Sequence, residues 1–146
     1  MKKNAFTLVE LLAVLVIIGV LSAISIAIFS NSIIESKNSL SNVQKNQLVD
    51  AARTYVAINT IGFNNIFDNM TVGEDRSCVA LSVGALVTEG LIGPNVIDPK
   101  DSSNLNGYIK IKYNASTSQY EYEYVESFNC RYRYIVENDK VVLKED

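Results

Sequence analysis

The feature that most constrains this chain is a long apolar run close to its N-terminus. Residues 6–29 contain one charged side chain, Glu10, among mostly Ala, Val, Ile, Leu and Phe residues. A helix over this run would be about 36 Å long, which exceeds the bilayer's hydrocarbon thickness of about 30 Å. Lys2 and Lys3 precede the run and no basic residue follows before Lys37. This charge bias predicts a cytoplasmic N-terminus and an exported remainder of the chain.

Composition argues against several functional classes. The 146 residues carry a net charge of -3 and include no histidine, the commonest general base and metal ligand. The sequence has no G-x-S-x-G, C-x-x-C or H-E-x-x-H motif and no phosphate-cradling glycine loop. We therefore expect neither an enzyme nor a cofactor. The acidic balance also argues against a broad nucleic-acid-binding face.

The position of Glu10 has several readings when the residues are taken alone. Thr7 and Glu10 have the spacing of a capping box, in which the carboxylate closes the start of its own helix. A plain single-pass anchor does not explain the acid. A secretory signal cut near Ala27 is also possible, although a charge near the start of the apolar core weakens such a signal.

The opening residues "MKKNAFTLVE" carry a resemblance to a known family. A basic leader, then Ala5, Phe6, and Glu10 four residues after that Phe, resemble the N-terminal signature of type IV prepilins and pseudopilins. The resemblance implies that residues 1–5 are a leader removed by prepilin peptidase and that Phe6 becomes N-methylated. Ala5 stands where Gly is usual in the family, and no proline interrupts residues 6–58.

The resemblance also implies a role for Glu10 in assembly. Cleavage after Ala5 would expose an ammonium at Phe6, and an isolated charge at membrane depth costs several kcal/mol. Glu10 of another copy can offset it, so the acid would set the register between subunits. The implied partners are copies of this chain and other pilins, the peptidase, a pilus assembly membrane protein and an ATPase. The implied location is the cell membrane, followed by an extracellular filament.

Helical periodicity continues beyond the apolar run. Residues 6–29 would be a transmembrane or filament-core helix, and residues 30–58 its amphipathic continuation with apolar residues at spacings of three or four. A partly small-residue side of the first half suits close helix packing. Its members are Leu8, Leu12, Val16, Gly19, Ala23 and Ala27. The apolar stripe of the second half comprises Ile33, Leu40, Val43, Leu48, Ala51, Ala52, Tyr55 and Ile58.

Residues 59–107 read as a connecting region. The pattern from Gly62 to Asn65 predicts a helix stop, and a short helix is expected from near Ser82 to Gly90. This layout is similar to the link between helix and sheet in pilins. Turns follow, whose Asp98, Asp101 and Asn104 could offer oxygens to Ca²⁺; we read them as turn residues and predict no metal.

Residues 108–146 alternate with the period of strands. They predict an antiparallel sheet of about four strands whose tyrosines and isoleucines cover the helix, so the fold class is α+β. The resemblance to type IV prepilins implies that this is a pilin fold. Successive strands carry lysines, glutamates and arginines on the other face, so neighbouring strands would place opposite charges across from each other. The tyrosines and arginines also suit single-stranded nucleic acid, but the glutamate row beside them argues for core packing instead.

Cys78 and Cys130 are the only cysteines. The exported side of a membrane permits a disulfide, and pilins often carry one near the C-terminus. Such a bridge would close a loop of about 53 residues, which the chain-entropy model credits with about 4 kcal/mol. Two free thiols are the alternative.

The resemblance implies a structural subunit of a type IV pilus or pilus-like filament. A pseudopilin of a type II secretion or competence DNA-uptake system is the alternative within the same class. A monomeric, membrane-anchored binding domain is the alternative from another class. A secreted protein cut near Ala27 would be a third.

Overall fold

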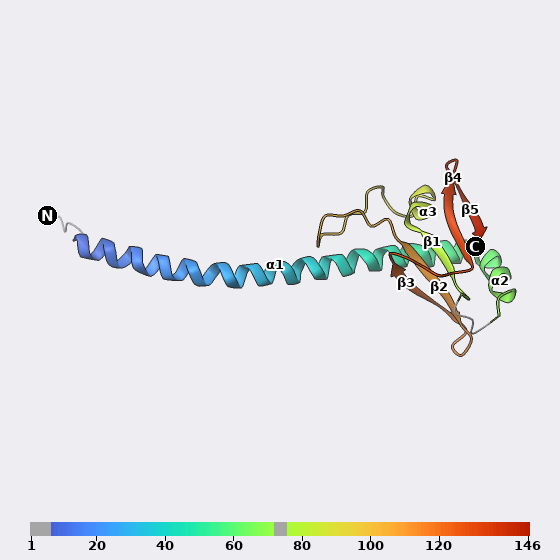
Figure 1. The fold of residues 1–146 in the computed structure, drawn as a ribbon, viewed down its shortest axis with the longest axis horizontal. Helices are drawn as coiled ribbons and strands as arrows, with labels where there is room; N and C mark the ends of the chain where they lie inside the picture. The colour runs from blue at the N-terminus through green and yellow to red at the C-terminus, as the bar shows by residue number, and fades with distance from the viewer. Residues whose placement is uncertain (1–6, 72–75) are drawn as a thin grey trace. The chain divides into compact units, whose positions relative to one another are not determined.

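The computed structural model describes residues 7–71 and 76–146. They form three helices and five strands, and the chain divides into two units, residues 1–39 and 40–146. The elements are α1 (Leu8–Ile58), α2 (Thr60–Asp68), β1 (Val79–Ser82), α3 (Val83–Thr88), β2 (Tyr108–Asn114), β3 (Gln119–Val125), β4 (Tyr132–Glu137) and β5 (Lys140–Glu145). A long N-terminal helix whose second half packs against a sheet confirms the α+β prediction (Figure 1).

The second half of α1 packs on the sheet through a narrow apolar stripe. Leu48, Ala52 and Tyr55 recur at spacings of three or four, and all three are buried. The predicted stripe started too early in the helix, since Ser41 is the first buried residue among the described side chains of α1. The members that stay exposed, each by about half or more of its surface, are Ile33, Leu40, Val43 and Ile58.

The sheet has five strands in the order β3-β2-β1-β4-β5: the strands predicted for residues 108–146 are present as β2 to β5, and a fifth strand makes the sheet mixed rather than wholly antiparallel. The extra strand, β1, comes from the connecting region and lies at the centre, antiparallel to β2 and parallel to β4 (Figure 1). Val79, Ala80 and Leu81 are all fully buried, since this strand is covered on both faces. The expected short helix follows β1 directly as α3, with the Ser82 hydroxyl accepting a hydrogen bond from the Ala85 N–H at 3.1 Å.

The predicted helix stop at residues 62–65 was also wrong, because these residues lie inside α2. Asn59 interrupts the helical run instead, immediately before α2 starts. Phe63 and Phe67, one turn apart, are the buried residues of α2. The Phe63 ring contacts Tyr55 of α1 and Tyr134 of β4, with centroids 6.1 and 5.3 Å away. Burial of these rings offsets the low helix propensity of Gly62 and its asparagine neighbours.

The predicted pairing of opposite charges across neighbouring strands is present between β2 and β3. The lysines of β2 stand opposite the glutamates of β3, in the pairs Lys110 with Glu123 and Lys112 with Glu121. Arg133 of β4 does not neighbour β3, because β2 and β1 intervene, and Arg131 lies just before β4. Arg133 instead stands opposite Lys144 of β5, which is a like-charge pair. An ion pair from Arg133 to Asp146 and another from Lys144 to Glu137 offset it.

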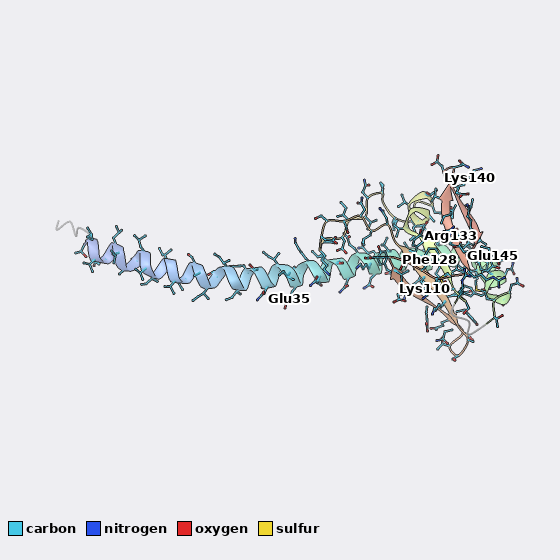
Figure 2. The ribbon with its side chains drawn as sticks, viewed as in Figure 1. Glu35, Lys110, Phe128, Arg133, Lys140 and Glu145 are labelled. Atoms are coloured by element: carbon cyan, nitrogen blue, oxygen red, sulfur yellow. A yellow bond between two sulfur atoms is a disulfide. The ribbon has the colours of Figure 1, made fainter. Side chains whose placement is uncertain are left out.

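The connection from β3 to β4 is held by the predicted disulfide. Cys78 and Cys130 are bonded and almost completely buried. Beside them the Phe128 ring packs on Tyr108 with centroids 4.5 Å apart, and Ala80 completes this small cluster. Figure 2 labels Phe128, which like Cys130 comes from the connection itself. Residues 126–131 are thereby joined to β1 and β2.

Candidate assembly helix

Glu10 lies in the first turn of α1 and is bonded to Thr7. Its Oε2 atom accepts hydrogen bonds from the Thr7 backbone N–H and from the Thr7 hydroxyl, each at 2.9 Å. The Thr7 hydroxyl in turn accepts the Glu10 N–H at 3.3 Å. This reciprocal arrangement is the capping box that the spacing predicts. Both side chains are exposed, and Thr7 is the only hydrogen-bonding partner of the Glu10 carboxylate within the described residues.

The predicted cleavage site lies outside the described residues. Ala5 and Phe6, together with Lys2 and Lys3, precede Thr7, where the described chain starts. Cleavage after Ala5 and methylation of Phe6 therefore stay predictions. The described residues do place Glu10 one helical turn from that end of the chain.

The first half of α1 is an apolar surface without cover from its own chain. Every described side chain from Leu8 to Leu40 is exposed, as Figure 2 shows along the helix. Leu8 is 79% exposed, Leu12 59% and Val16 58%. A Cβ built on Gly19 would meet nothing within 4 Å. An apolar surface of this length is typical of contact with lipid or with other helices.

Three serine side chains within this surface are satisfied by the helix itself. Three serine hydroxyls donate to the carbonyl one turn earlier: Ser22 to Ile18 at 2.7 Å, Ser25 to Leu21 at 2.8 Å, and Ser30 to Ile26 at 2.9 Å. Such back-bonding removes the need for water or for a partner at these positions. By length and composition, α1 is able to cross a membrane, which fits membrane anchoring.

Sequence reasoning missed a polar contact at the start of the buried part of α1. Asp98 is buried, accepts the Ser41 hydroxyl at 2.8 Å and the Lys100 N–H at 2.9 Å, and lies 3.7 Å from the Lys45 ammonium. The Lys100 N–H, then Ser41, and more weakly Lys45 hold the pKa of Asp98 below its usual value. The turn pattern at residues 98–101 marked this aspartate, but nothing in the sequence identified its partners on α1.

The other two residues considered for Ca²⁺ make turn contacts. Asp101 accepts hydrogen bonds from the backbone N–H and the hydroxyl of Ser103, at 3.0 and 2.7 Å. Asn104 forms an isolated β-bridge with Ile97. Within residues 7–71 and 76–146, no three side chains of the metal-binding types His, Cys, Asp and Glu come together.

Comparison with known proteins adds one match. Residues 1–26 match the family described as the prokaryotic N-terminal methylation motif, which is the signature of type IV pilins and pseudopilins. No curated protein and no solved structure shows a significant match. The motif confirms the resemblance in residues 1–10 and supports a type IV pilin-like or pseudopilin protein in general. Proteins that carry it are structural rather than enzymatic.

Proposed function

We propose that this chain is a prepilin, the precursor of a structural subunit in a type IV pilus or pilus-like filament. One combination of observations carries the proposal. The methylation motif covers residues 1–26, and the first half of α1, which starts within it, is apolar, exposed on all sides and long enough to span a bilayer. The apolar surface of such a helix has to be covered by lipid before assembly and by other helices afterwards.

Processing comes first in this proposal. Prepilin peptidase cleaves between Ala5 and Phe6, and the new N-terminal amine of Phe6 is methylated. Lys2 and Lys3 keep this end of the chain cytoplasmic, so the globular part crosses to the outer side. A pilus assembly membrane protein and an ATPase then move the subunit from the membrane into the filament.

Glu10 directs assembly by meeting the amine of a neighbouring copy. Thr7 supplies the carboxylate with two hydrogen bonds from uncharged donors, so its negative charge is solvated locally but not neutralised. The Phe6 ammonium of a displaced neighbour supplies the missing positive charge in the apolar surroundings. Pairing satisfies both groups, whereas a wrong register leaves two isolated charges.

The packing face is the small-residue side of the same helix. Leu8, Leu12, Val16 and Gly19 recur at spacings of three or four, and all are exposed. Gly19 allows the backbone of a neighbouring helix to approach closely at that level, because no side chain intervenes. The filament core would consist of these helices.

Intact-mass and N-terminal analysis of the protein purified from its own cells tests the proposal. The expected product begins at Phe6 and carries one added methyl group. A chain that begins near residue 28 would indicate a cleaved secretory signal. A chain that still begins at Met1 would indicate a monomeric membrane anchor, and either result would contradict the proposal.

A pseudopilin role remains the second candidate, because the same motif occurs in both groups. Deleting the gene and comparing surface fibres with protein secretion and DNA uptake separates the two. A pilus subunit is expected to affect surface fibres, whereas a pseudopilin would affect secretion or uptake while surface fibres remain.

A further inference from the structure

The globular unit has a hollow between α2 and the β2–β3 hairpin. Its volume is about 420 Å³, and it opens to the surface. The lining residues are Asn64, Phe67, Asp68, Met70, Tyr113 and Tyr120. Half of these side chains are aromatic, and none carries a positive charge. This site plays no part in the proposed assembly through α1.

Asp68 places a negative charge in this hollow at an electrostatically unfavourable position. It is the last residue of α2, where the helix dipole is already negative, and the last turn of α2 contains no basic residue. Within the described chain its carboxylate has no hydrogen bond and no ion pair. Burial raises the pKa of Tyr120, and Tyr113 and Asp68 raise it further, so the field of the carboxylate reaches into the hollow.

The aromatic wall is ordered by contacts among its own members. The Tyr120 ring lies 5.3 Å from Phe67 and 5.5 Å from Tyr113, measured between centroids. The Tyr120 hydroxyl donates to Asn64 Oδ1 at 2.6 Å. Because this hydroxyl donates its proton to Asn64, its oxygen can accept a hydrogen bond from a ligand but cannot donate one. Tyr113 is 38% exposed, so a ligand from solvent can reach its ring.

We propose that this hollow binds an organic cation, an alkylammonium or guanidinium group. A carboxylate at the negative end of a helix, aromatic rings and an acceptor hydroxyl all attract positive charge. The described wall offers no cation beside the exposed Asp68 carboxylate, so a cationic ligand would find this carboxylate without a competing ion pair. A neutral sugar would use the rings but would leave this charge unbalanced.

Titration of the full chain in non-ionic detergent micelles tests the proposal. The tyrosine rings are isotope-labelled, and NMR shifts are followed during addition of tetramethylammonium, N-acetyl-lysine amide, N-acetyl-arginine amide or glucose at constant ionic strength. We expect a saturable shift of the Tyr113 and Tyr120 signals with at least one of the cations. Tetramethylammonium reports a free amine as ligand, and the amino-acid amides report a basic side chain of a partner.

Two variants and a matched control make the test specific. Asp68→Asn and Tyr113→Leu change exposed positions and are each expected to weaken binding at least about threefold. Asp139→Asn, which removes an exposed carboxylate in the β4–β5 turn, should leave the affinity unchanged. The proposal is overturned if no cation gives a saturable shift, if glucose binds as well as the cations do, or if Asp68→Asn binds like the unmodified chain.

Discussion

The carboxylate of Glu10 accepts two hydrogen bonds from Thr7, one from the backbone N–H and one from the hydroxyl, each at 2.9 Å. The same carboxylate is therefore a helix cap in the single chain and the proposed partner of a neighbour's amine in the filament. The two roles are separable by substitution. Glutamine supports a capping box almost as well as glutamate does, but it carries no charge.

We expect Glu10→Gln to abolish filament assembly while the protein accumulates in the membrane at its normal level. The amide oxygen keeps the bonds to Thr7, so the start of α1 is preserved, but no negative charge remains to meet the Phe6 ammonium. Immunoblots of the sheared surface fraction and of the membrane fraction measure the two pools. Normal fibres from this variant would show that Glu10 serves only as a cap.

Thr7→Val is the complementary change. It removes the hydroxyl from the capping box and leaves the charge of Glu10 intact, at a local cost of about 1 kcal/mol in helix stability. Fibres are expected to form at near-normal levels in the same shearing assay. If Thr7→Val lost its fibres while Glu10→Gln still assembled, the capping box rather than the charge of Glu10 would be what assembly requires.

We expect the Cys78–Cys130 disulfide to contribute about 2–5 kcal/mol to the stability of the globular unit. The bond joins residues 52 positions apart and ties the β3–β4 connection to the central strand. Replacing both cysteines with alanine should lower the thermal midpoint of the full chain in micelles, followed by circular dichroism. Reductant should lower the midpoint of the unmodified chain and leave that of the double variant unchanged; equal midpoints for the two oxidised proteins would contradict the prediction.

We expect Asp98 to make the globular unit less stable in acid. Its pKa is lowered in the folded chain, chiefly by the Lys100 N–H and then by the Ser41 hydroxyl, so the folded state binds fewer protons than the unfolded state does. Stability from this group is therefore present above the unfolded pKa of about 3.9 and is lost as pH falls through the lower folded value. Urea unfolding of the full chain between about pH 6 and pH 3 should show a smaller decline for Asp98→Asn. An identical decline in both proteins would show that Asp98 carries no such linkage.

Two glycines form a matched pair for testing the packing of the globular unit. A Cβ on Gly107 would lie 2.5 Å from the Val125 carbonyl oxygen and 2.7 Å from the Tyr124 hydroxyl, whereas a Cβ on Gly62 would meet nothing within 4 Å. We expect Gly107→Ala to destabilise the unit by about 1–3 kcal/mol, because the β2–β3 pairing must shift. Gly62→Ala should stabilise it by up to about 1 kcal/mol through helix propensity. Urea unfolding measures both, and an unchanged or lower stability of Gly62→Ala would argue against α2 as described.

Several parts of this architecture were readable from local patterns. The period of three to four beyond the membrane run predicted the buried face at Leu48 and Ala52, and strict alternation predicted β2 and β3 with their lysines facing glutamates. These patterns can be recognised within a single helix or strand, because burial of one face makes its apolar residues recur at a fixed spacing. The missed strand β1 and the misplaced helix stop both arose where burial depends on distant partners. α2 exists because Phe63 meets rings from α1 and β4, and β1, whose first three residues are all buried, has no alternation to reveal it.

What the amino-acid sequence determined by itself is the membrane-capable helix, its methylation motif and the position of the lone acid within it. Those properties depend on hydrophobicity, charge and spacing along a single element, which need no tertiary contact. Only the tertiary structure decided that β1 lies at the centre of a mixed sheet, that Asp98 bonds to Ser41, and that Asp68 enters an aromatic hollow. Strand order and pairings between distant residues depend on how the elements fill a common core, and the pattern along one element does not contain that information.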